Sequence, residues 1–232
     1  MTRRRRLVPA SEGEPVRESK PDAEVIEGHE WIAEQARFEE LVAELVSADR
    51  IAIDTEFHRE RTYWPSLALI QIRHGDHIAL VDPTKVDIAP LAAALTRPLI
   101  IMHAASQDLE VLDRSCGMIP ERLFDTQVAA GFTGMSTPSL SNLVERYIGV
   151  RIPKGDRLTD WFERPLTSGQ RRYAASDVAH LFELHDMLVS DLDSSGRLEW
   201  AQDECELART PSRSAVPPEL SYTRIKEARH LR

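Results

Sequence analysis

The 232-residue chain has no long apolar run, only two cysteines and few aromatic residues. No hydrophobic stretch approaches the roughly 18–20 residues that a membrane-spanning helix needs, so we expect no membrane contact. A basic run occupies residues 3–6, but no apolar segment follows it, which argues against a secretory signal. Cys116 and Cys205 lack metal-type spacing and are typical of thiols in a reducing compartment, so the sequence predicts a cytoplasmic protein.

The chain also lacks an excess of positive charge. Its formal net charge is −9, whereas surfaces that bind nucleic acid are usually basic. A site built from carboxylates has negative charge of its own, which bound metal ions offset. The charge therefore argues against tight non-specific binding of nucleic acid, but it does not exclude a nuclease.

Proline and mixed charge mark both ends of the chain. Residues 1–24 are typical of a flexible tail, whose basic run can be solvated or can contact nucleic acid. Pro211 to Pro218 is typical of a linker, and a basic, helix-prone stretch follows it. The sequence predicts a tail over 1–24, one domain over 25–208, and a linker with the start of a further helical domain over 209–232.

The spacing of apolar residues between these ends predicts an α/β domain. Helices are expected over 38–46, 106–116, 139–148 and 168–190, and strands over 51–57, 67–72, 77–81 and 99–102. The first three strands have short connections, which suits an antiparallel meander, and the fourth is apolar throughout, as in strands buried on both faces. Strands followed by alternating strands and helices predict a mixed sheet flanked by helices.

Two carboxylates share one face of the first expected strand. Alternate residues of a strand point the same way, so Asp54 and Glu56 lie on one face and Ile53 and Phe57 on the other. Paired carboxylates repel each other, and a divalent metal ion, which prefers oxygen ligands, relieves that repulsion. The alternative is a strand end that reaches solvent, where paired acids cost little.

Two later stretches add further polar candidates. Asp108 falls in the first turn of the helix expected after the apolar strand, where either the helix dipole or a ligand site at the strand end explains an acid. His103, at the end of that strand, can contact substrate or simply pack. Tyr173 and Asp177 are four residues apart on one helix face, so Asp177 either serves a site or is a buried acid hydrogen-bonded to tyrosine or backbone.

The order of these motifs resembles that of the DEDD exonuclease superfamily, and more closely its ribonuclease D branch, whose last motif carries tyrosine. The resemblance covers roughly residues 25–205 and fills every acidic position of the pattern. The matching segments are Asp54-Thr55-Glu56-Phe57, Leu69-Ile70-Gln71-Ile72, Phe124-Asp125-Thr126-Gln127, Trp161 through Gln170, and Tyr173 with Asp177.

The resemblance implies a ribonuclease-H-like fold with a mixed five-stranded sheet. It implies that Asp54, Glu56, Asp108 and Asp177 hold two divalent metal ions, Mg²⁺ or Mn²⁺, and that Tyr173 holds and helps activate the attacking water. The implied activity is a 3′-5′ exoribonuclease that releases 5′-nucleoside monophosphates by two-metal-ion hydrolysis, in the maturation or turnover of RNA 3′ ends such as those of tRNA precursors. In family members a helical HRDC domain often follows and helps to engage nucleic acid.

Substrate contacts are expected from Phe57, Gln71, His103 and Trp64. Aromatic side chains near the first motif, Tyr63 included, suit base stacking, although Tyr63 and Trp64 can equally be packing residues. Two alternatives stay open: a DNA-directed 3′-5′ exonuclease, and a non-catalytic nucleic-acid-binding adaptor on the same fold, which would have lost a metal carboxylate. No protein partner follows from the sequence.

Overall fold

The computed structural model describes residues 28–59, 64–152 and 159–209. The expected N-terminal tail, Tyr63 and all but the first residue of the 209–232 segment lie outside these ranges. Within them, no helix combines the length and the apolar character required to cross a membrane.

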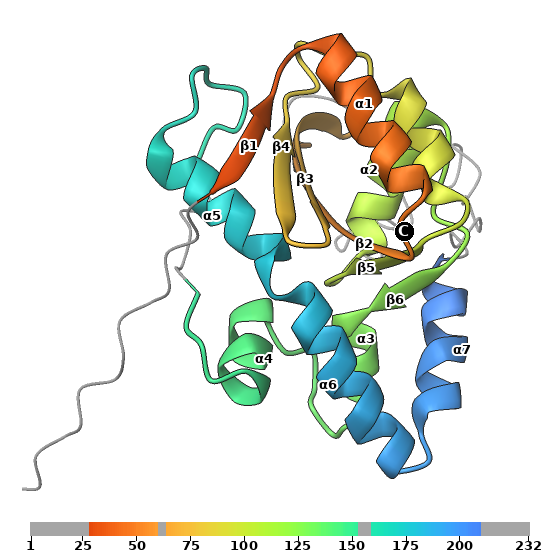
Figure 1. The fold of residues 1–232 in the computed structure, drawn as a ribbon. Coiled ribbons are helices and arrows are strands. Elements are labelled where there is room, and N and C mark those ends of the chain that lie inside the picture. The colour runs from red at the N-terminus through yellow and green to blue at the C-terminus, as the bar shows by residue number, and fades with distance from the viewer. Residues whose placement is uncertain (1–27, 60–63, 153–158, 210–232) are drawn as a thin grey trace, which may run out of the picture.

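A six-stranded mixed sheet forms the middle of the molecule (Figure 1). Its strands are β1 (His29–Ile32), β2 (Arg50–His58), β3 (Ser66–His74), β4 (His77–Val81), β5 (Leu99–Met102) and β6 (Leu123–Asp125). They lie in the order β1-β4-β3-β2-β5-β6; β2, β3 and β4 pair antiparallel, and the other three pairs are parallel. The predicted meander and mixed sheet are confirmed.

The spacing of apolar residues predicted four strands and the resemblance implied a sheet of five, whereas the structure has six. Both strands that the sequence reading missed lie at the edges of the sheet, and they are only four (β1) and three (β6) residues long. Such short segments show no period of apolar residues, and they become strands because a longer neighbour offers its backbone for pairing.

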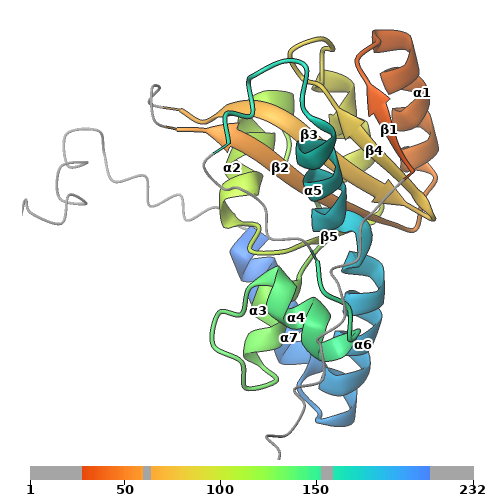
Figure 2. The same ribbon diagram turned by 90° about the vertical axis from the view of Figure 1, so that its left-hand side faces the viewer.

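Helices cover both faces of the sheet. They are α1 (Gln35–Val46), the 3₁₀ helix η1 (Ala89–Leu95), α2 (Ser106–Cys116), α3 (Thr126–Gly131), α4 (Leu140–Tyr147), α5 (Ser168–Ala179), α6 (Leu181–Ser194) and α7 (Leu198–Arg209). Helix α1 and helix α5 lie on opposite faces, and α3, α4, α6 and α7 gather below the sheet (Figures 1 and 2).

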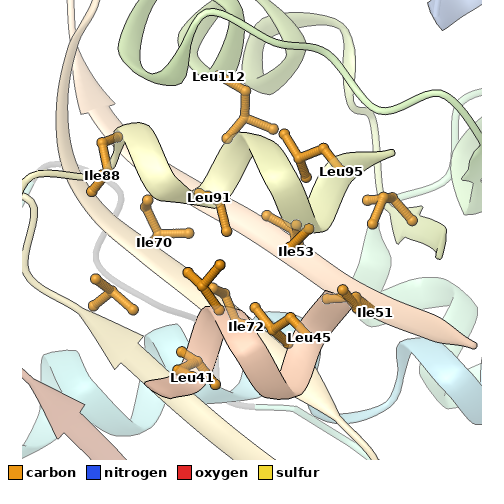
Figure 3. Packing of buried hydrophobic residues seen from close by; sticks show 14 of the residues in the cluster. Leu41, Leu45, Ile51, Ile53, Ile70, Ile72, Ile88, Leu91, Leu95 and Leu112 are labelled. Carbon is orange, nitrogen blue, oxygen red and sulfur yellow. The ribbon is translucent and has the colours of Figure 1, made fainter. Parts of the chain in front are cut away.

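The first of two hydrophobic cores lies between the sheet and α1, η1 and α2 (Figure 3). Strands β2 and β3 direct alternate isoleucines into it, and all of these side chains are fully buried: Ile51, Ile53, Ile70 and Ile72. Burying one such side chain contributes roughly 1.5–3 kcal/mol. Since strand residues alternate, this packing turns Asp54 and Glu56 to the opposite face, toward α5.

The second core lies under α5 and the lower helices, and small residues dominate where α5 meets the sheet. Ala174, Ala175 and Val178 are buried against the strands, which brings the α5 backbone close to β2, β3 and β4. The single helix expected over 168–190 is in fact two, because His180 (φ −111°, ψ 6°) ends α5 before α6 begins. The apolar period runs through this break, so the pattern alone does not reveal it.

Candidate active site

Three carboxylates from two elements converge on the α5 face of the sheet. One side-chain oxygen each of Asp54, Glu56 and Asp177 lies within 4.8 Å of the other two. Asp54 and Glu56 alternate along β2, and Asp177 comes from α5, which packs across β2 and β3. Carboxylate oxygens at this spacing suit a shared divalent cation.

Asp108 joins the cluster from the first turn of α2. It is buried, and the Thr55 hydroxyl donates a hydrogen bond of 2.5 Å to its Oδ1 atom. Thr55 is buried, and it lies between Asp54 and Glu56 in the sequence of β2. This strand therefore carries two of the carboxylates and orients a third. The sequence analysis gave Thr55 no role, and its position inside the first motif was the only signal for one.

Burial is the largest cause of the raised pKa values of Asp54, Glu56 and Asp108. The pKa of Asp54 lies well above its ordinary value because of burial, and then because of the charges of Asp108, Asp177 and Glu56. Burial, followed by the charges of Asp177 and Asp108, raises the pKa of Glu56 to about 8. Burial also raises the pKa of Asp108 to about 6, against the opposing hydrogen bond from Thr55.

This donor set fits divalent metal ions. A cation among the carboxylates stabilises their charged forms, and so it offsets both the cost of burying them and their mutual repulsion. None of the described residues that line the surrounding pocket is a lysine or arginine. Oxygen-only ligands are those that Mg²⁺ and Mn²⁺ prefer.

The cluster opens into a pocket of about 450 Å³. Tyr173 and His103 line it together with the four acids, as do residues that the sequence analysis did not assign: Gln107, Gln127, Thr137, Ser139 and Leu140. Phe57 lines it too, although strict alternation placed Phe57 on the opposite face, because the strand register shifts between Glu56 and Phe57. The ring of Tyr173 stacks on Trp161, with ring centroids 6.1 Å apart and an interplanar angle of 28°. This stacking holds the tyrosine ring in place beside Asp177.

Asp125 holds together two backbone segments beside the pocket. Its Oδ1 atom accepts hydrogen bonds from the backbone N–H of Ala104 (3.0 Å) and of Gln127 (2.8 Å), and its Oδ2 atom accepts one from Ala105 (2.8 Å). Ala104 adopts a left-handed φ of 57° in this turn. A single buried carboxylate thus ties the start of α3 to the turn before α2. This structural role accounts for an aspartate in the 124–127 segment, one of the segments that carry the family resemblance.

His103 lies in the turn that Asp125 holds. Its Nδ1 atom is 2.9 Å from the Thr126 hydroxyl, and burial lowers its pKa, partly offset by the charge of Asp125. The imidazole is therefore uncharged at neutral pH, and it can exchange hydrogen bonds with a bound molecule without adding charge.

Two expected substrate contacts do not line the pocket. Gln71 pairs with Asp54 across β2 and β3, but it is fully buried, and its side-chain amide has no hydrogen-bond partner among the described residues. Trp64 is 46% exposed, and the guanidinium of Arg114 lies 3.1 Å from its ring centroid. Arg114 is in the last turn of α2, whereas Asp108 is in the first. Their sequence positions near the motif did not show that a helix covers one and that an arginine stacks on the other.

Known proteins resemble this chain in sequence and in fold. A family profile described as 3′-5′ exonuclease matches residues 29–193. Ribonuclease D of Zymomonas mobilis is 43% identical over 204 residues, which are 85% of this chain and 52% of that protein. Ribonuclease D of Escherichia coli is 43% identical over 186 residues, which are 78% of this chain and 50% of that protein.

A solved structure shows the same fold. The crystal structure of Escherichia coli ribonuclease D, described as an exoribonuclease involved in structured RNA processing, aligns with a TM-score of 0.81 at 38% identity. The alignment covers 89% of this chain and 56% of that one. The chain thus spans about half the length of the curated relatives that it matches.

Proposed function

This chain belongs to the 3′-5′ exonuclease family, and from that membership we propose that it removes nucleotides from the 3′ ends of RNA and releases 5′-nucleoside monophosphates. Exonucleases of the DEDD superfamily use two divalent metal ions. The similarity to ribonuclease D supports RNA as the substrate class, with tRNA precursors as one source of 3′ ends. We place the exonuclease domain at 25–208 and the protein in the cytoplasm, in keeping with the free thiols of Cys116 and Cys205.

The observation that carries this proposal is the convergence of the four carboxylates. Asp54, Glu56 and Asp177 bring oxygens within 4.8 Å of one another, and Asp108 is close enough that its charge raises the pKa of Asp54. A group of four acids this close together, partly removed from solvent, is costly. Fold stability alone gives no reason to build it, whereas a site for cations does.

We assign the metal ligands and the positioning groups separately. Asp54, Glu56, Asp108 and Asp177 would hold two ions, Mg²⁺ or Mn²⁺. When bound, the ions neutralise the charge of the phosphodiester and make water more acidic. The four side chains would contribute by holding that charge at one place on a rigid strand and two helices, with Thr55 fixing the orientation of Asp108.

Tyr173 would orient the attacking water through its hydroxyl group. An ordinary phenol has a pKa near 10 and is a poor base at neutral pH, so a hydrogen-bonding role suits it better than proton abstraction. Stacking on Trp161 restricts the ring, which favours precise placement of the hydroxyl. On the substrate side, Phe57 offers an apolar surface to a base or ribose, and His103 offers an uncharged hydrogen-bonding group.

A labelled-substrate assay tests the proposal. RNA and DNA of one sequence, labelled at the 5′ end, are incubated with the chain in EDTA, in Mg²⁺ and in Mn²⁺, with Asp54→Asn as the matched control. We expect RNA to shorten from its 3′ end one nucleotide at a time, no reaction in EDTA, and a block by a 3′-terminal phosphate.

The other outcomes separate the alternatives. Cleavage in EDTA contradicts the metal-dependent mechanism, and internal cuts contradict an exonuclease. Faster digestion of DNA than of RNA identifies a DNA-directed enzyme. Binding of either strand without any cleavage in Mg²⁺ or Mn²⁺ identifies the adaptor.

A further inference from the structure

A second group of metal-competent side chains lies on the opposite face of the sheet, where the β3–β4 hairpin meets the end of α1. His74 and His77 face each other across the two-residue turn of the hairpin, and Glu44 belongs to the last turn of α1. One nitrogen of each histidine and one oxygen of Glu44 all lie within 4.8 Å of one another. This group shares no residue with the carboxylate cluster.

The distances within this histidine cluster fit a small tetrahedral ion. His74 Nε2 lies 3.1 Å from His77 Nδ1 and 3.3 Å from Glu44 Oε2. An ion bound to nitrogen at about 2.0–2.1 Å in tetrahedral geometry separates its ligand atoms by roughly 3.3 Å. The two imidazole rings meet edge to face, at 84° to each other and with their centroids 5.1 Å apart.

The groups behind the three ligands are also arranged as in metal sites. His77 turns its other nitrogen, Nε2, to Glu30 Oε2 at 3.0 Å, and this leaves Nδ1 directed at His74. A histidine that binds a metal almost always donates its second ring N–H to a carboxylate or carbonyl, which fixes its tautomer and orientation. Arg37 holds Glu30 by two hydrogen bonds of 2.8 and 2.9 Å, and it also binds Glu44 through Oε1 at 3.1 Å. Glu44 therefore keeps Oε2 for the histidines.

Charge favours a cation at this point as well. Three carboxylates, those of Glu30, Glu40 and Glu44, lie within 4.0 Å of one guanidinium, that of Arg37, so the group keeps negative charge when the histidines are neutral. Without a metal, a proton on His74 Nε2 would lie between His77 Nδ1 at 3.1 Å and Glu44 Oε2 at 3.3 Å. A metal ion would replace that proton.

We propose that Glu44, His74 and His77 form a binding site for a transition-metal ion of the Zn²⁺ type, which ties the β3–β4 hairpin to α1. Two imidazoles with one carboxylate suit Zn²⁺, whereas Mg²⁺ prefers oxygen ligands and keeps its water. Glu44 is about half exposed, which leaves a fourth position for solvent. The two clusters thus select different ions, and the histidine cluster would act on stability and not on phosphodiester chemistry.

Zinc titration of the whole chain tests this site. The protein is stripped with EDTA, dialysed into excess Mg²⁺ to occupy the carboxylate cluster, and titrated with Zn²⁺ by calorimetry, with thermal melting in parallel. We expect one equivalent of Zn²⁺ to bind and to raise the melting temperature, because a ligand that binds only the folded state stabilises it. The same binding is expected in Asp54→Asn.

Three variants decide whether the named residues carry the binding. His77→Asn should abolish it, and Glu30→Gln, which removes only the carboxylate behind His77, should weaken it by about 10–100-fold. His58→Gln is the matched control. His58 also lies near a carboxylate, that of Asp160 at 3.8 Å, but it does not belong to the histidine cluster. This variant should bind Zn²⁺ as the wild type does.

Two results would overturn the proposal. The first is the absence of saturable Zn²⁺ binding to the wild type in Mg²⁺. The second is equal affinity in His77→Asn and wild type. Should His77→Asn melt abnormally in metal-free buffer, Glu44→Gln replaces it, since that side chain is exposed at the end of a helix and its loss removes one ligand without disturbing a core.

Discussion

The two clusters on opposite faces of the sheet differ in how their charges are satisfied. The carboxylates around Asp54 repel one another and have raised pKa values, so that cluster is unfavourable until cations bind. In the histidine cluster around His74, Arg37 already binds Glu44, and His74 Nε2 lies within hydrogen-bond distance of His77 Nδ1, so an ion there would replace existing contacts. The first cluster thus sets like charges against one another, whereas the second is held by hydrogen bonds that an ion would replace.

The largest effect is expected from removing one charge from the carboxylate cluster. Asp54→Asn should lower the rate of RNA digestion by about 10³-fold or more, because charge stabilisation by bound metal supplies several kcal/mol and each 1.36 kcal/mol is a tenfold rate. His77→Asn, in the other cluster, should keep the wild-type rate at saturating Mg²⁺. A loss of less than tenfold in Asp54→Asn, measured in single-turnover assays, would mean that Asp54 is misassigned.

The next largest effect concerns Tyr173, which separates chemistry from packing. If its hydroxyl orients water, Tyr173→Phe should slow the single-turnover step by about 10²–10⁴-fold, the usual range for such groups. Metal affinity and melting temperature should hardly change, because Phe keeps the ring that stacks on Trp161. Near-normal cleavage by a normally folded variant would reduce Tyr173 to a packing residue.

A smaller effect is expected on the pH dependence of stability without metal. The pKa of Glu56 is raised to about 8 in the folded state, so between about 4.5 and 8 the folded protein holds a proton that the unfolded chain has released. Stability should therefore fall as pH rises through this window, by up to about 1.36 kcal/mol per pH unit for one proton. Saturating Mg²⁺ should abolish this fall.

Denaturant unfolding at several pH values measures that dependence. The matched variant is Asp54→Asn, which removes one repelling charge and should raise the metal-free melting temperature at pH 8. A gain of about 1 kcal/mol corresponds to about 2–4 °C in a chain of this size. A metal-free wild type that becomes steadily more stable from pH 5 to pH 8 would contradict the repulsion argument.

The histidine cluster should show the smallest effect, with the opposite sign. The pKa of His74 lies below its ordinary value of 6.5, so the unfolded chain takes up a proton there before the folded protein does. Its neutral form favours folding above pH 6.5, and that contribution is lost as pH falls below 6.5. His74→Gln should therefore lose less stability than wild type between pH 7 and pH 5. An identical acid-side loss in both proteins would show that His74 titrates normally.

Local patterns in the sequence determined much of the fold and part of the site. The two-residue period of β2 places Asp54 and Glu56 on one face, and the four-residue spacing on α5 places Tyr173 beside Asp177. Both relations depend only on backbone geometry between near neighbours, so they can be predicted without knowing what packs where. The order of the motifs then indicated the family.

Tertiary structure alone decided which of these faces meet. Gln71 was expected to contact substrate, yet the small residues of α5 let that helix cover it. Thr55 became the hydrogen-bond partner of Asp108, which comes from α2. The histidine cluster joins Glu44 to residues about thirty positions later, through the docking of α1 on the hairpin. Periodicity describes one element at a time, whereas contact between elements depends on how two separate cores pack against one sheet.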